Sequence, residues 1–149
     1  MDIKLLTPVL SVAGQISTAD LPAIANGGFK SVVCNRPDGE GADQTGFKVI
    51  EQAAQAAGLQ TRYLPVETGQ VTDEQGVAFG QLIDELPKPV LAYCRSGMRC
   101  TTLWALANAG QRPLPEIIET AARAGYDLKG LVYRLERRKD PSRAGESLP

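Results

Sequence analysis

The chain has 149 residues and a mass of 15.9 kDa, which is the size of one domain and too short for two ordinary ones. It carries 16 Lys and Arg against 17 Asp and Glu, and the resulting net charge of −1 argues against a nucleic-acid binder. Histidine is absent, which excludes His-based metal sites, His general bases and Ser-His or Cys-His pairs.

The 3 cysteines are an odd number without C-x-x-C spacing, so neither a secreted disulfide scaffold nor a zinc ribbon is expected. The apolar run Leu5–Val12 is interrupted by Thr7, Pro8 and Ser11, which makes it too short and broken for a signal peptide or a membrane span. It favours a strand instead. We therefore expect a cytoplasmic protein with reduced thiols, no metal, no cofactor and no membrane contact.

Strand-like and helix-like segments alternate along the chain. Short apolar and β-branched segments predict four strands: Val9–Ala13, Ser31–Cys34, Thr61–Val66 and Val90–Tyr93. Apolar residues at helical spacing predict helices at about residues 18–27, 43–58, 72–87 and 101–109, with two more beginning near 115 and 128. Asp43 is the expected cap of the second helix, and Thr72 with Gln75 fits a capping box.

This alternation predicts a single α/β domain over residues 1–138, with a mainly parallel central sheet flanked by helices. Residues 139–149 lack periodicity and are expected to form a flexible tail. Ligands of such sheets bind at the carboxyl ends of the strands. We therefore expect three loops to converge: Asn35–Gly41, Glu67–Val71 and Cys94–Cys100.

The last of these loops carries the strongest chemical signal. Cys94 ends a strand and is followed by Arg95, Ser96, Gly97, Met98, Arg99 and Cys100. Backbone N–H groups of such a loop form an anion nest, the following helix adds its positive end, and Arg99 adds a planar cation. In that field the thiolate of Cys94 is favoured, so its pKa should fall below the usual value and make it a nucleophile.

Four segments in order resemble a known family: Leu10–Gln15, Gly28–Glu40, Leu64–Val66 and Ala92–Arg99. Over about residues 5–110 the chain is similar to the phosphatase-like domain family of the beta-lactamase-hydrolase-like proteins. The resemblance implies a fold of the dual-specificity phosphatase type and a role in sulfide or persulfide handling. It also implies, as a partner, a metallohydrolase that resembles sulfur dioxygenases.

Two departures separate the sequence from cysteine phosphatases. Arg99 stands five positions after Cys94, as in rhodanese-type sulfurtransferases, whereas cysteine phosphatases place the arginine six positions after the cysteine. The aspartate that protonates the leaving oxygen in phosphatases is replaced by the stretch containing Glu67 and Thr68. Tyr93 also takes the place of the histidine that often precedes the phosphatase cysteine.

The main prediction is a sulfurtransferase acting on a small anionic or thiol substrate. Cys94 attacks the outer sulfur of thiosulfate or a low-molecular-weight persulfide, Arg99 and the loop hold the Cys94 persulfide, and an acceptor thiol removes the sulfur. The first alternative is a phosphatase with a phosphocysteine intermediate, in which Glu67 or Asp38 replaces the missing acid. The second is a non-catalytic persulfide or redox sensor.

Three further residues have two interpretations each. Arg36 either binds substrate or pairs with Asp38 or Glu40 within a turn. Cys34 is either a redox partner of Cys94 or a core residue. Cys100 is a weaker candidate for that pairing, because one short loop rarely positions two cysteines for a disulfide.

Overall fold

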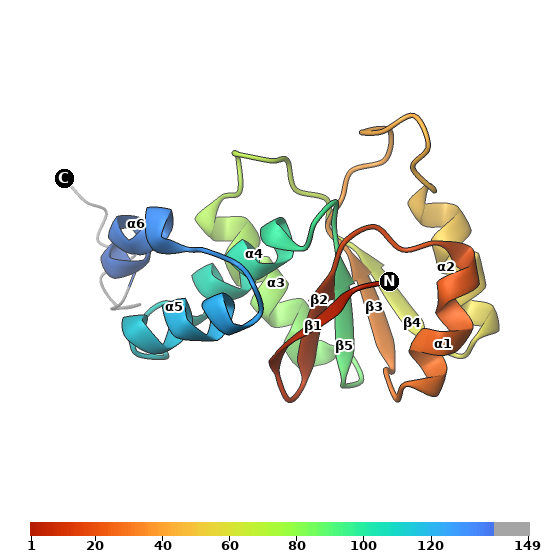
Figure 1. The fold of residues 1–149 in the computed structure, drawn as a ribbon, viewed down its shortest axis with the longest axis horizontal. Coiled ribbons are helices and arrows are strands. Elements are labelled where there is room, and N and C mark those ends of the chain that lie inside the picture. The colour runs from red at the N-terminus through yellow and green to blue at the C-terminus, as the bar shows by residue number, and fades with distance from the viewer. Residues whose placement is uncertain (139–149) are drawn as a thin grey trace.

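The computed structural model describes residues 1–138, and the expected tail at 139–149 lies outside the described residues. The central element is a five-stranded sheet with the strand order β1-β2-β5-β3-β4. Its strands are β1 (Ile3–Thr7), β2 (Leu10–Ala13), β3 (Ser31–Cys34), β4 (Gln60–Tyr63) and β5 (Val90–Tyr93). Figure 1 shows this sheet between two groups of helices.

The pairing confirms a mainly parallel sheet. Strands β2, β5, β3 and β4 run parallel, and only β1 is antiparallel to its neighbour β2. The interpretation of Leu5–Val12 as one strand is wrong, because the chain turns at Pro8 and makes a hairpin. The turn is closed by Thr7, whose hydroxyl accepts a hydrogen bond from the N–H of Val9.

Helices cover both faces of the sheet (Figure 1). On one side lie α1 (Leu21–Asn26) and α2 (Phe47–Ala56); on the other lie α3 (Asp73–Glu85), α4 (Met98–Asn108), α5 (Leu114–Arg123) and α6 (Val132–Arg137). Short 3-10 turns at Thr18–Asp20 and Lys129–Leu131 precede α1 and α6. Among residues 1–138 no helix is long and apolar enough to cross a membrane.

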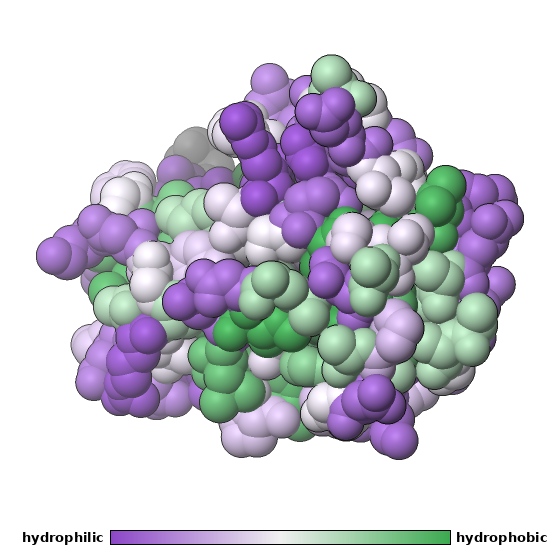
Figure 2. Space-filling view, turned by 45° about the vertical axis from the view of Figure 1, so that its right-hand side comes forward, coloured by the Kyte–Doolittle hydropathy of each residue, from purple (hydrophilic) through white to green (hydrophobic). Residues whose placement is uncertain are grey.

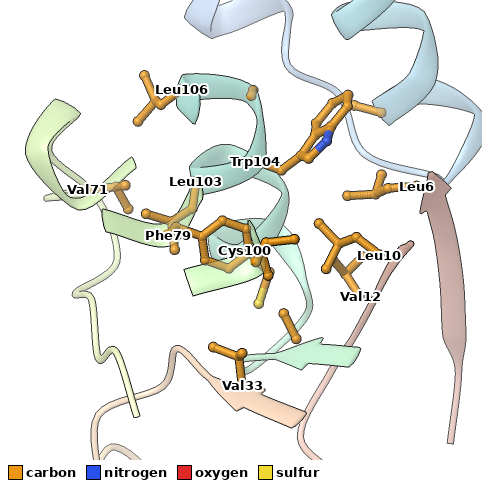
Figure 3. Close-up of a cluster of buried hydrophobic side chains, with 14 of the residues drawn as sticks. Leu6, Leu10, Val12, Val33, Val71, Phe79, Cys100, Leu103, Trp104 and Leu106 are labelled. Atoms are coloured by element: carbon orange, nitrogen blue, oxygen red, sulfur yellow. The ribbon is translucent and has the colours of Figure 1, made fainter. Parts of the chain in front are cut away.

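The core divides into two clusters because successive side chains of a strand point to opposite faces. Val12, Val33 and Ala92 face the cluster beneath α3 and α4, whereas Ala13 and Leu91 face the cluster beneath α1 and α2. Figure 3 shows the first cluster, in which Cys100 of α4 lies among apolar side chains from both strands and helices.

The predicted helix at about 101–109 is α4, which is buried on nearly all sides and begins at Met98 rather than near Thr101. The residue before it, Gly97, has a φ of 91°, a conformation that glycine adopts without a steric penalty. The earlier start places Arg99 and Cys100 in the first turn of the helix.

Of the other predicted helix starts, that of α3 is confirmed and that of α2 is wrong. The capping box of Thr72 and Gln75 at α3 is confirmed. Asp43 does not cap α2; instead the Asp38 carboxylate accepts a hydrogen bond of 2.8 Å from the N–H of Phe47, the first residue of that helix. The predicted strand Thr61–Val66 also ends earlier, at Tyr63.

Candidate active site

The candidate site lies where β5 ends, at the carboxyl edge of the parallel strands. The loops that follow β3 and β4 project from the same edge at the top of Figure 1. Figure 2 shows hydrophilic residues gathered at this upper edge. Direct hydrogen bonds join all three loops, because Arg99 reaches both the Glu40 carboxylate and the carbonyl oxygen of Val66. The predicted convergence is therefore confirmed.

The Cys94 loop is held from outside by its carbonyl groups. The carbonyl of Arg95 accepts from the N–H of Gln15 at 3.4 Å, and that of Ser96 accepts from the Tyr126 hydroxyl at 2.9 Å. The carbonyl of Gly97 accepts from both the N–H and the hydroxyl of Thr101, at 3.0 and 2.9 Å. Carbonyl and N–H groups of one peptide point in opposite directions, so this arrangement turns the loop's N–H groups inward.

The sulfur of Cys94 lies inside this ring of N–H groups. The N–H of Gly97 donates to it at 3.1 Å, and the side chain is only 1% exposed. The pKa of Cys94 is lowered to about 5, first because the Cys100 thiol donates a hydrogen bond to it. Donation by the N–H groups of Cys100, Ser96 and Gly97 adds to this effect and outweighs the opposing effect of burial. Cys94 is therefore a thiolate at neutral pH, as the sequence predicted.

Cys100 is the donor rather than a second nucleophile. Its thiol is fully buried, and burial first, then the hydrogen bond to Cys94, raises its pKa well above the ordinary value. A thiol that keeps its proton can serve as a donor at every physiological pH. Sequence reasoning gave Cys100 little weight as a disulfide partner of Cys94 and did not foresee its role as a hydrogen-bond donor to that sulfur.

Arg99 is fixed in one orientation by a shared carboxylate. Its two terminal nitrogens each donate to Glu40 at 2.8 Å, and one of them also donates to Val66 O at 2.9 Å. Glu40 additionally accepts from Arg36 Nε at 3.0 Å. Hydrogen bonds from these two guanidinium groups, that of Arg99 first, hold the pKa of Glu40 below its usual value, although partial burial opposes them. The Nε of Arg99 makes none of these contacts, which leaves it available to an anion.

Glu40 acts as a clamp that holds the Arg99 guanidinium group, and Arg36 supports Glu40 in this role. The Arg36 side chain is only 9% exposed, and besides Glu40 it donates to Gln15 Oε1 at 3.0 Å. Of the two interpretations of Arg36, the pairing with Glu40 is the one seen. Substrate binding by Arg36 stays a prediction.

The two candidate acids differ in their surroundings. The Asp38 carboxylate is engaged at the start of α2, as described above, and the Asp38 N–H donates to the Tyr63 hydroxyl oxygen at 3.0 Å. Glu67 is exposed, and its carboxylate has no hydrogen bond or ion pair to any residue within 1–138. It directly precedes Thr68, which lines a cavity beside the Cys94 loop.

Cys34 belongs to the other core cluster. It is paired in register with Tyr93, and both side chains lie beneath α1 and α2, whereas Cys94 and Cys100 lie in the opposite cluster. Its thiol donates to the carbonyl of Arg36 at 3.3 Å, and burial is the first cause that raises its pKa. The structure thus brings Cys100, not Cys34, into contact with Cys94, and a redox role for Cys34 stays a prediction.

Sequence reasoning missed Tyr126, Gln15 and the structural role of Glu40. Tyr126 stands between α5 and α6, 30 residues from the carbonyl that it binds, and no motif surrounds it. Glu40 had a detectable signal, because it closes a turn rich in charged residues in the loop after β3. Its contact with Arg99, 59 positions away, depends on the tertiary structure and could not be read from the sequence.

A buried thiolate in an N–H cradle, an arginine at the first turn of the next helix and a mostly parallel sheet define a cysteine phosphatase-like domain. The comparisons agree with this class. The phosphatase-like domain of the beta-lactamase hydrolase-like proteins matches residues 2–111, so the chain belongs to that family.

Relatives and solved structures support the assignment. The chain is 37% identical over 130 residues to a beta-lactamase hydrolase-like protein of Agrobacterium fabrum, and 33% identical to one of Xylella fastidiosa. Each alignment covers 86% of this chain but 30% of the relative, so the chain spans under a third of these proteins' length.

Among solved structures, a candidate phosphatase of Neisseria meningitidis is 38% identical with a TM-score of 0.84, over 91% of this chain and 97% of that one. The active form of Tk-PTP is 17% identical with a TM-score of 0.73, over 94% and 97%, which shows a shared fold. The expectation of a dual-specificity-phosphatase type of fold is confirmed. These findings favour the phosphatase alternative over the sulfurtransferase prediction.

Proposed function

We propose that this chain is a cysteine-dependent phosphatase that hydrolyses phosphomonoesters through a phosphocysteine on Cys94. The observation that carries the proposal is the Cys94 thiolate, whose pKa of about 5 arises from donors arranged around its sulfur. The same donors are positioned for the oxygens of a bound phosphoryl group. The 38% identical protein of Neisseria meningitidis, described as a candidate phosphatase, gives further support.

The first step transfers the phosphoryl group to sulfur. The Cys94 thiolate attacks phosphorus, an S–P bond forms, and the P–O bond to the alcohol breaks. Charge on the three non-bridging oxygens is held by the loop N–H groups and by Nε of Arg99, which Glu40 keeps in place. The departing alkoxide needs a proton, because it is a poor leaving group.

We assign that proton to Glu67. Asp38 is engaged with α2 and Glu40 with two arginines, whereas the Glu67 carboxylate has no partner within the described residues. In the second step Glu67 takes a proton from water, the water oxygen attacks phosphorus, and the S–P bond breaks. Inorganic phosphate leaves and the Cys94 thiolate is restored.

Sulfur transfer remains a second candidate on one specific observation. Arg99 follows Cys94 by five positions, so the cradle is one residue shorter than in cysteine phosphatases. A shorter cradle suits the terminal sulfur of a persulfide, and thiosulfate expels sulfite, which needs no acid. If the chain transfers sulfur, its partner would be a separate metallohydrolase that consumes the persulfide product.

One experiment separates the two candidates. Purified reduced protein is incubated with para-nitrophenyl phosphate, and separately with thiosulfate and cyanide, and released phosphate and thiocyanate are measured. We expect phosphate release by the wild type and a loss of at least about a thousandfold in Cys94→Ser. Cys34→Ser serves as the matched control, because its thiol faces the other core cluster.

Intact mass spectrometry then identifies what Cys94 carries. A quenched phosphatase reaction should show the gain of one phosphoryl group, absent in Cys94→Ser. Thiocyanate formation with the gain of one sulfur atom, and no phosphate release from any ester, would overturn the phosphatase proposal in favour of sulfur transfer. A persulfide that forms but is never passed on would favour a sensor.

A further inference from the structure

A cavity of about 630 Å³ adjoins the Cys94 loop. Arg95, Ser96, Met98 and Arg99 of the loop and of the start of α4 form one wall. The segment after β4, the turn before α6 and α6 itself form the others, which brings Val71, Leu131 and Arg134 to the same space. The size is that of a pocket for a small molecule.

The walls of this cavity carry three guanidinium groups, two of which pair with carboxylates that lie outside the lining. Three guanidinium groups line it and, among the described residues, no Asp or Glu does. Arg99 is bound to Glu40, and Arg134 to the Asp73 carboxylate at 2.9 Å. Arg95 is exposed, and its guanidinium group has no hydrogen bond or ion pair within residues 1–138. The guanidinium group of Arg95, the residue that follows the nucleophile Cys94, is therefore the unpaired cation among the described residues that line this cavity.

Building on the proposed phosphatase activity, we propose that the substrate is a small phosphoester that carries a second anionic group, bound in this cavity by Arg95 and Arg134. A phosphate or a carboxylate matches the fork of a guanidinium group. Val71, Met98 and Leu131 provide apolar surface for the carbon skeleton between the two anions. A phosphate with an uncharged leaving group would use the loop but leave Arg95 without a partner.

The test compares two aryl phosphates that differ in one substituent. Para-nitrophenyl phosphate has no second anion, and 4-carboxyphenyl phosphate has a carboxylate in place of the nitro group. We expect the wild type to show a lower KM for the carboxylate ester. Arg95→Gln should lower kcat/KM for that ester about tenfold more than it lowers the value for para-nitrophenyl phosphate.

The control is Arg123→Gln, which removes an exposed arginine of α5 that pairs with Glu119 on the surface. It should leave the ratio of the two kcat/KM values unchanged. Equal losses for both esters in Arg95→Gln, with activity retained in the wild type, would overturn the second-anion subsite and leave the phosphatase proposal standing. Hydrolysis of neither ester by the wild type would overturn both.

A different observation concerns Tyr126. Its hydroxyl donates to the carbonyl of Ser96, and the N–H of Gly97 donates to Cys94 Sγ at 3.1 Å. These two groups belong to one planar peptide. A Cβ at position 97 would collide with the Tyr126 hydroxyl, so the ring lies directly against the loop.

We infer that Tyr126 is a positioning residue that fixes the plane of the 96–97 peptide and strengthens its N–H as a donor to the thiolate. Hydrogen bonds in a chain polarise one another, so accepting at the carbonyl makes the N–H at the other end a better donor. Burial is the first cause that raises the pKa of Tyr126, and the nearby Cys94 adds to it, so the hydroxyl keeps its proton and remains a donor.

Tyr126→Phe tests this inference, because it keeps the ring and removes only the hydroxyl. We expect the pH midpoint of Cys94 alkylation to rise, so that the rate at about pH 5 falls roughly threefold and recovers above pH 7. Tyr133→Phe, at a side chain that is 76% exposed, is the matched control. An unchanged midpoint in a folded Tyr126→Phe protein would overturn the positioning role, whatever the substrate.

Discussion

Cys34 and Cys94 stand at the ends of neighbouring parallel strands, and both are buried, at 2% and 1% exposure. Their chemistry is opposite. The pKa of Cys94 is lowered to about 5, whereas that of Cys34 is raised. The difference lies in what each sulfur faces: Cys94 accepts from a ring of N–H groups and a thiol, while Cys34 donates to the carbonyl of Arg36.

This comparison teaches that burial alone does not decide the reactivity of a thiol. Desolvation raises the pKa of both cysteines, and donors reverse the effect only at Cys94. The donors exist because Gln15, Tyr126 and Thr101 hold the loop's carbonyls outward. Residues that never touch the sulfur of Cys94 thus hold in place the groups that do.

The largest expected effect is a contrast in alkylation. With iodoacetamide at about pH 6.5, Cys94 should react at least about a hundred times faster than Cys34 or Cys100, because only its thiolate is populated there. The rate at Cys94 should fall as the pH drops through about 5. Peptide mass spectrometry measures each site, and unfolded protein, in which all three should react alike, is the control. Similar rates in the folded protein would refute the contrast.

The next effect concerns the clamp on Arg99. Glu40→Gln removes the charge that holds both guanidinium groups, and we expect kcat/KM for para-nitrophenyl phosphate to fall about tenfold. Because the pKa of Glu40 is lowered, the clamp persists while Cys94 titrates, so the acid limb of the wild-type profile belongs to Cys94. Glu116→Gln, which breaks a surface pair with Arg112, should change nothing. Full activity in Glu40→Gln would mean that Arg99 needs no clamp.

The smallest expected effect concerns the Cys100 thiol as a hydrogen-bond donor to Cys94. Cys100→Ala removes the S–H bond to Cys94 and should raise the Cys94 pKa by about one unit, so that activity near pH 5.5 falls about threefold and recovers at pH 8. Cys100→Ser keeps a donor and should preserve the wild-type profile. The measurement is kcat/KM against pH. Identical profiles for the two variants would show that the thiol does not act as a donor.

Much of the fold was predictable because short sequence patterns determine most of its strands and helices. Short apolar and β-branched segments located β3 and β5, and the spacing of Thr72 and Gln75 located the capping box of α3. The alternation of segments indicated a mainly parallel sheet. The hairpin was missed because β1 and β2 are joined so tightly that their residues form one apolar run. The start of α2 was misplaced because its cap, Asp38, comes from a loop nine positions earlier in the chain than Phe47.

The candidate site was predictable only in its centre. Cys94, Gly97 and Arg99 form a contiguous motif whose chemistry follows from residue type and spacing. The partners of these residues come from elsewhere: Glu40 from the loop after β3 and Tyr126 from beyond α5. Contacts between distant segments depend on packing, which no local pattern encodes.

The contact from Tyr126 also bears on how this domain can be divided. The match to the family model covers residues 2–111, and Tyr126 lies beyond it. A fragment cut at that boundary would retain every residue of the Cys94 loop. It would lose the brace on Ser96 and, with Ala121, Leu128 and Leu135, one side of the core around Trp104. We therefore expect that a fragment that keeps Cys94 in its reactive state needs residues beyond the match to the family model.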